Sequence, residues 1–179
     1  MTVVIDPGHG GHDSGAVGPT GLKESGVNLR VSLSVGSLLV RAGIPVSYTR
    51  TDDRFVAINA RWKQANKEDA DYFVSIHCNS DGPSAEGIET LVEENRGESY
   101  ELALLVQNQL IKVTDERDRG IKARPDLGVL AGTEMTAILV EIGFISNAKT
   151  EAKLRTNDYV QRIVEALADG IALHLGVTG

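Results

Sequence analysis

Residues 3–11 read Val-Val-Ile-Asp-Pro-Gly-His-Gly-Gly, a run of β-branched residues that leads into a glycine-rich loop. This pattern predicts a short buried strand that ends at the loop. Two further apolar runs, residues 72–76 and 137–140, also end at polar residues and are predicted to be strands. Between them, apolar residues recur at helical spacing, as over residues 23–41. This alternation predicts an α/β fold, a mostly parallel twisted sheet with helices on both faces.

The rest of the chain continues the alternation. Further strands are expected at residues 44–48 and 87–93. Further helices are expected around Ile58 and Trp62, with Asp52 or Asp53 as cap, and over residues 102–113 and 160–171. There is no linker, repeat or low-complexity segment, so residues 1–179 are expected to form a single domain.

Composition and charge exclude several classes of protein. The chain has 18 Lys and Arg against 25 Asp and Glu, a formal net charge of −7, which argues against nucleic acid as a partner. No apolar stretch approaches the roughly 20 residues of a membrane span. Cys78 is the only cysteine, so no disulfide can form within the chain. The first strand follows Met1 directly, so we expect any targeting signal to lie outside this sequence.

Polar residues follow three of the predicted strands. His9, His77 and Glu141 each come just after an apolar run, and Glu24 lies at the start of the first long helix. Because parallel strands end at the same edge of a sheet, we expect these side chains to meet there. Two imidazoles and a carboxylate are a common ligand set of catalytic zinc, and a further carboxylate can move protons. We assign His9, Glu24 and His77 to the metal and Glu141 to catalysis, although spacing alone would allow the two glutamates to be exchanged.

Competing interpretations of the same residues are weaker. The loop at residues 8–13 has Asp13 in place of the third glycine of a dinucleotide-binding loop. Cys78 adjoins His77, but neighbours on a strand point to opposite faces, which disfavours a Cys–His dyad. His12 is the rival metal ligand, and we expect it to be a loop or supporting residue instead. Asp6 is a candidate to orient a ligating histidine.

Five motifs together resemble a known family. They are the segment at 3–11, Gly-Leu-Lys-Glu (21–24), Thr-Arg-Thr-Asp-Asp (49–53), Ser-Ile-His-Cys-Asn (75–79) and Leu-Val-Glu-Ile-Gly-Phe-Ile-Ser-Asn (139–147). In order and spacing they resemble the zinc-dependent N-acetylmuramoyl-L-alanine amidases of the AmiC/CwlC type, over residues 3 to about 173. One motif alone would be a weak signal, but the ordered set is specific.

The resemblance implies a function and a set of roles. His9, Glu24 and His77 match the family's zinc ligands, and Glu141 matches its catalytic glutamate. It implies that residues 1–179 are a catalytic domain that cuts the amide between N-acetylmuramic acid and L-alanine in bacterial peptidoglycan. It also implies an extracellular, cell-wall-associated autolysin, with the targeting signal or wall-binding domain outside this sequence. The sequence does not reveal the oligomeric state, and we expect a monomer.

Two other functions remain open at this point. One is a zinc peptidase or deacetylase that acts on a different amide. The other is a wall-binding module without catalysis, which the sequence disfavours because all four proposed positions keep competent side chains.

Overall fold

The structure, a computed structural model, describes residues 1–177 and is built around one six-stranded sheet. The strand order is β2-β1-β3-β6-β4-β5. The strands are β1 (Val3–Pro7), β2 (Val46–Tyr48), β3 (Tyr72–Asn79), β4 (Ile88–Val92), β5 (Asp118–Ala123) and β6 (Thr136–Phe144). The helices are α1 (Glu24–Arg41), α2 (Ile58–Lys67), α3 (Gly97–Thr114), α4 (Gly128–Ala131), α5 (Ala148–Leu154) and α6 (Asn157–His174). The predicted α/β class is confirmed.

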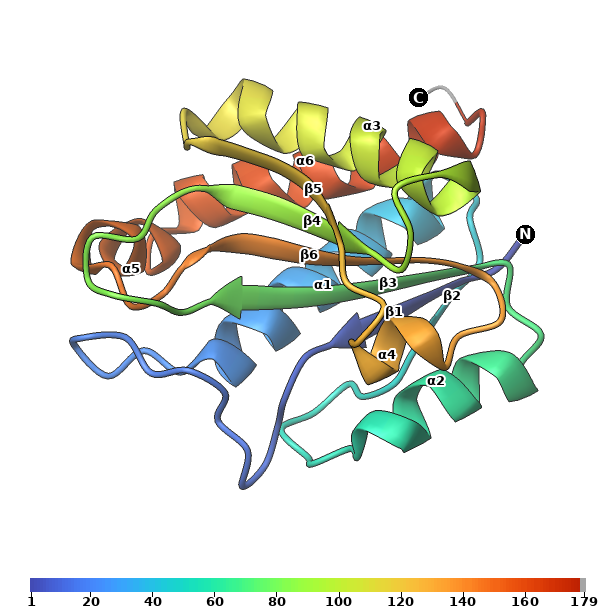
Figure 1. Ribbon diagram of the computed structural model, residues 1–179, viewed down its shortest axis with the longest axis horizontal. Coiled ribbons are helices and arrows are strands. Elements are labelled where there is room, and N and C mark those ends of the chain that lie inside the picture. Colours follow the sequence, from blue (N-terminus) through green and yellow to red (C-terminus); the bar gives the residue numbers. More distant parts are fainter. Residues whose placement is uncertain (178–179) are drawn as a thin grey trace.

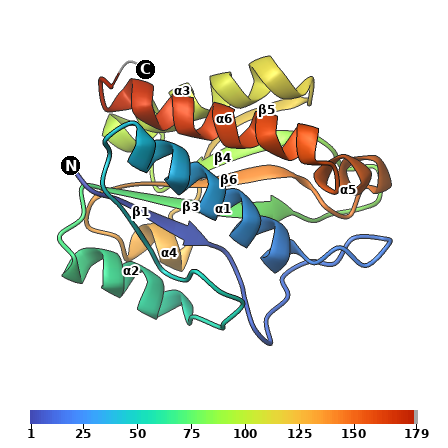
Figure 2. The same cartoon turned by 180° about the vertical axis from the view of Figure 1, so that it is seen from behind.

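Helices cover both faces of the sheet. α1, α3 and α6 pack on one face, and α2 and α4 lie on the other (Figures 1 and 2). Consecutive strand residues point to opposite faces, so Val3 and Ile5 enter the larger apolar core and Val4 enters the smaller one. The central strands are therefore apolar on both sides, as expected for a covered sheet.

The sheet is mostly parallel, with one exception. β4 pairs with β6 in antiparallel fashion, whereas the other pairs of neighbouring strands run parallel. The short segment at residues 80–87 causes this reversal, because it contains no helix that could carry the chain back across the sheet. As a result, β1, β3 and β6 end, and β4 and β5 begin, at one edge, on the left in Figure 1.

Some local expectations are corrected. β5, α4 and α5 were not expected, since each is short and has no sustained apolar period. Neither Asp52 nor Asp53 caps α2, which begins after Ala57 without a side-chain cap. Asp53 instead accepts a hydrogen bond from the Gly11 amide at 2.9 Å, which ties two loops together.

The structure places no membrane-spanning segment within the residues that it describes. None of the helices of residues 1–177 combines the length and the apolar character needed to cross a bilayer.

Candidate active site and metal centre

Three side chains from distant parts of the sequence meet at the carboxyl edge of the sheet. His9 Nε2 lies 3.2 Å from Glu24 Oε1, and His77 Nδ1 lies 3.0 Å from the same oxygen. One ligand atom from each residue lies within 4.8 Å of the other two. The structure therefore brings together the three residues that the sequence assigned to the metal.

Close backbone packing makes this convergence possible. A Cβ atom at Gly8 would lie 2.3 Å from the His77 ring, and one at Gly15 would lie 2.5 Å from Glu24 Oε2. Larger residues at these positions would push the ligands apart. Arg61 stabilises the loop that carries Gly8 and His9. Its guanidinium donates to the His9 carbonyl at 2.9 Å and forms an ion pair with Asp6 at 2.7 Å.

Asp13 orients the His9 ring. Its Oδ2 lies 2.8 Å from His9 Nδ1, which leaves Nε2 directed at Glu24. Ligating histidines are held in this way by a carboxylate on the second ring nitrogen. The expectation that Asp6 would orient a ligating histidine is wrong: Asp6 accepts hydrogen bonds from Thr49, Ser75 and Arg61.

Glu24 is buried and held in its ionised form. Burial opposes ionisation, but hydrogen bonds and charge attraction from His77 and His9 outweigh it and lower the pKa of Glu24 below its ordinary value. The same contact with Glu24 is the main cause that raises the pKa of His9 to about 9. Two imidazole nitrogens and a carboxylate around one point are a donor set that fits zinc.

Glu141 lies beside this cluster but outside it. It stands opposite His77 in the pairing of β3 with β6. Its Oε2 is buried and has no hydrogen-bond partner within residues 1–177. Burial is the main cause that raises the pKa of Glu141 to about 7. An unpaired buried carboxyl is costly, so its retention marks a candidate functional group. Of the two glutamates that sequence spacing left interchangeable, only Glu24 contacts both histidines.

A pocket of about 650 Å³ adjoins the two histidines. It lies against the face covered by α2 and α4, and its wall is largely apolar, with Phe55, Ile58, Trp62 and Leu127 among the lining residues. The pocket offers an apolar surface next to the polar centre, the usual composition of a binding site for an organic molecule.

The side chains rejected on sequence grounds, those of His12 and Cys78, offer no atom to the ligand cluster. The His12 ring packs on Phe55, with 4.2 Å between the ring centroids, and is exposed. Cys78 is fully buried, and its thiol lies 3.6 Å from Asn28 Oδ1, where it packs as a small core residue.

The sheet edge thus gathers three candidate metal ligands, a separate buried carboxyl group and an adjoining pocket, an arrangement typical of hydrolytic enzyme domains of the α/β class. The chain belongs to the N-acetylmuramoyl-L-alanine amidase family, whose sequence profile matches residues 3–173. The family resemblance seen in the motifs is thereby confirmed.

Individual relatives agree with this assignment. The chain is 42% identical to the Bacillus subtilis protein YqiI over 172 residues, which cover 95% of this chain and 82% of that protein. It is 34% identical to the sporulation-specific N-acetylmuramoyl-L-alanine amidase of the same organism, over 96% of this chain and 67% of that protein.

Solved structures of amidases share the fold. The catalytic domain of CwlV from Paenibacillus polymyxa superposes with a TM-score of 0.93 at 39% identity, covering 99% of both chains. AmiC2 of Nostoc punctiforme superposes with a TM-score of 0.93 at 36% identity, covering 98% of this chain and 97% of that one.

Proposed function

We propose that this chain is a zinc-dependent enzyme that hydrolyses the amide between N-acetylmuramic acid and L-alanine in peptidoglycan. Membership of the amidase family supports the reaction and the substrate. The observation that carries the metal assignment is the convergence of His9 Nε2 and His77 Nδ1 on Glu24 Oε1, beside the unpaired Glu141.

His9, Glu24 and His77 would hold the ion through one atom each. Zinc bound there would supply Lewis acidity, which polarises an amide carbonyl and lowers the pKa of water. The chain prepares the ligands in advance: Asp13 sets the orientation of His9, and the Ala16 amide donates to Glu24 Oε2 at 2.8 Å. A preset ligand geometry reduces the reorganisation needed on binding.

Glu141 is assigned the proton transfers. Because its Oε2 has no partner among the described residues, it is free to accept a proton from the attacking water and to pass it to the leaving nitrogen. Its position opposite His77 in the sheet, and its absence from the group of candidate ligand atoms, support this role.

The proposed biological setting follows from the substrate. The chain acts as a catalytic domain, residues 1–179, at the cell wall, with peptidoglycan as its partner and as a monomer. Cell-wall amidases among the relatives support this setting.

Digestion of purified peptidoglycan tests the function. The zinc-loaded protein is expected to release new N-terminal alanine, detected by labelling of free amines, in proportion to the metal bound. New reducing sugar ends in place of new amines would mean cleavage of the glycan and would refute the proposal. New amines on another residue would support a different amide hydrolase.

A further inference from the structure

Charged residues continue in a row from the proposed metal site across one face of the sheet. His77 on β3 stands opposite Glu141 on β6, and Glu141 stands opposite Glu89 on β4. Glu89 is nearly buried and is bonded by two cations of β5, Arg119 and Lys122. Three neighbouring strands therefore carry, in order, the candidate metal ligand His77, the proposed catalytic residue Glu141, and Glu89 with its two bound cations.

A bulge in β5 brings the two cations to the same face. The pairing of β4 with β5 shifts register around Glu89, so that the consecutive residues Arg119 and Gly120 both lie opposite it. Gly120 has a φ of 73°, a conformation that glycine adopts readily. In a regular strand Arg119 and Lys122, three positions apart, would point to opposite faces. Bulges near active sites often redirect side chains in this way.

The single negative charge of Glu89 does not neutralise both Arg119 and Lys122. Arg119 Nε and Lys122 Nζ both lie 2.6 Å from one oxygen of Glu89, Oε2, and the other oxygen accepts from Asn79 at 3.0 Å. Two positive charges on one carboxylate leave a net charge of +1 for the three groups.

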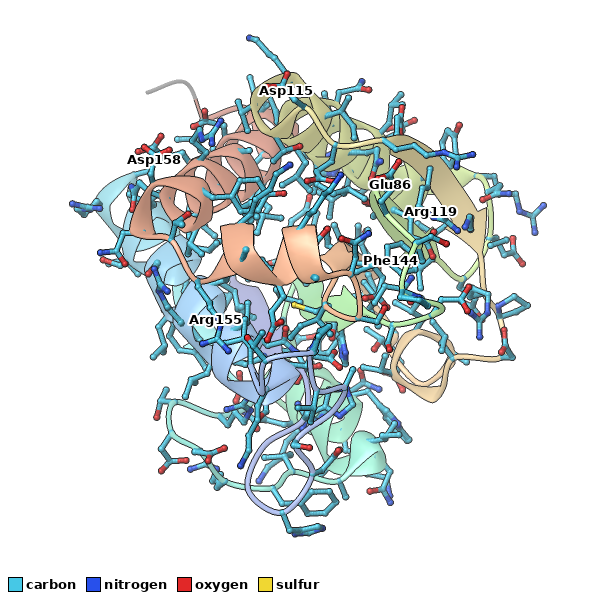
Figure 3. The ribbon with its side chains drawn as sticks, turned by 90° about the vertical axis from the view of Figure 1, so that its left-hand side faces the viewer. Glu86, Asp115, Arg119, Phe144, Arg155 and Asp158 are labelled. Atoms are coloured by element: carbon cyan, nitrogen blue, oxygen red, sulfur yellow. The ribbon has the colours of Figure 1, made fainter. Side chains whose placement is uncertain are left out.

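Both cations can also reach a ligand. The side chain of Lys122 is 42% exposed and that of Arg119 is 27% exposed. Within residues 1–177 the Lys122 ammonium bonds only Glu89, which leaves further N–H donors free. The Arg119 guanidinium lies over the Phe144 ring, 4.8 Å from its centre, at the edge shown in Figure 3.

We propose that Arg119 and Lys122 form a carboxylate-binding subsite for the stem peptide of the substrate. This proposal rests on the proposed function. In the proposed reaction, His9, Glu24 and His77 would hold the ion that polarises the scissile carbonyl, and Glu141 would protonate the leaving nitrogen. The peptide that carries this nitrogen would then continue from Glu141 toward β4 and β5. The muramic acid then lies on the opposite side, toward the pocket with Phe55 and Trp62.

The distances suit the second residue of the peptide. β5 lies two strand spacings beyond β6, roughly 10 Å. Two extended peptide residues span roughly 7 Å. Lys122 shortens the remaining gap, because its ammonium reaches back from β5 to Glu89 on β4. An acidic residue that follows the alanine can therefore place its carboxylate at the pair.

The test compares two synthetic N-acetylmuramoyl dipeptides. Both begin with L-alanine, and the second residue carries either a free carboxylate or the corresponding amide. We expect kcat/KM to be about tenfold higher for the free acid, mostly through KM, as for a charge-assisted hydrogen bond in a partly exposed site. Lys122→Met should reduce this ratio to near one, and Lys122→Arg should restore it. Lys112→Met, an exposed lysine on α3, is the matched control that should keep the wild-type ratio.

The possible outcomes distinguish substrate binding by Lys122 from a purely structural role of this residue. If Lys122 only fastened the edge strand, Lys122→Met would lower turnover of both substrates equally and leave the ratio unchanged, which would overturn the proposal. Equal kcat/KM of the wild type on both substrates would overturn it as well. Cleavage of neither dipeptide at the muramoyl–alanine bond would refute the proposed function instead. Dissociation constants of both dipeptides for the Glu141→Gln variant should show the same ratio in binding.

Discussion

Asp13 Oδ2 accepts a hydrogen bond from His9 Nδ1 at 2.8 Å, and this contact directs His9 Nε2 to Glu24. The carboxylate thereby sets both the orientation and the tautomer of the imidazole.

Asp13→Ala is expected to weaken zinc binding about 10- to 100-fold, because His9 would lose its orienting partner. Competition with a chromogenic chelator measures the affinity. His12→Ala is the matched control, since the exposed His12 lies in the same loop but outside the ligand cluster. Equal affinities of the two variants would rule out the orienting role.

Glu141→Gln is expected to keep zinc and fold but lose about 10²- to 10⁴-fold in kcat, the usual contribution of a general acid–base. Zinc analysis of the purified variant and release of N-terminal alanine from peptidoglycan give the two readouts. Substantial turnover in a zinc-loaded variant would remove Glu141 from the mechanism.

Removal of zinc is expected to lower the melting temperature. A ligand at 100 to 1,000 times its Kd stabilises the folded state by about 2.7 to 4.1 kcal/mol. At this chain length each kcal/mol corresponds to about 2 to 4 °C. Thermal unfolding before and after chelation, and again after zinc is restored, measures the shift. His77→Ala should show no response to zinc, and an unchanged Tm of the wild type would speak against the metal site.

Gly8→Ala is expected to abolish zinc binding, because the added Cβ would lie 2.3 Å from the His77 ring and displace it. Gly26→Ala in α1 is the matched control. Gly26 lies in the first turn of α1, and no atom lies within 4 Å of its added Cβ. Calorimetric titration with zinc compares them, and tight binding by Gly8→Ala would show that the loop tolerates a side chain.

Glu151→Gln is expected to destabilise the fold by about 1 to 3 kcal/mol at neutral pH. Glu151 is buried in α5 and accepts hydrogen bonds from the Thr20 and Leu22 amides, which anchors the loop that precedes α1. Urea unfolding measures the loss, and Glu165→Gln, on the exposed side of α6, is the control.

Glu151 is also expected to make the stability of the fold depend on pH. Burial opposes ionisation of Glu151, but the hydrogen bonds from Leu22 and Thr20 outweigh it and hold its pKa below the ordinary 4.5. A depressed pKa adds stability above about pH 4.5, and this stability is lost as the pH falls through the folded-state pKa. The wild type should therefore lose its advantage over Glu151→Gln in acid. A constant difference between pH 7 and pH 3 would contradict this assignment.

Much of the architecture could be read from local pattern. The strands that begin at Val3, Tyr72 and Thr136 are apolar on both faces, and each leads to a polar residue, so the shared edge and its candidate ligands were predictable. β5 was not, because Asp118–Ala123 is an edge strand with one strongly apolar residue and a glycine in a bulge.

The amino-acid order therefore specified the α/β class, the family and the identity of the side chains at the site, since these depend on periodicity and motif spacing. Three-dimensional packing was needed to show that Glu24, and not Glu141, contacts both histidines, and that Asp13 rather than Asp6 contacts His9. It was also needed to pair Arg119 and Lys122 on one face. These relationships depend on loop paths, sheet register and a bulge, which arise from contacts between residues far apart along the chain.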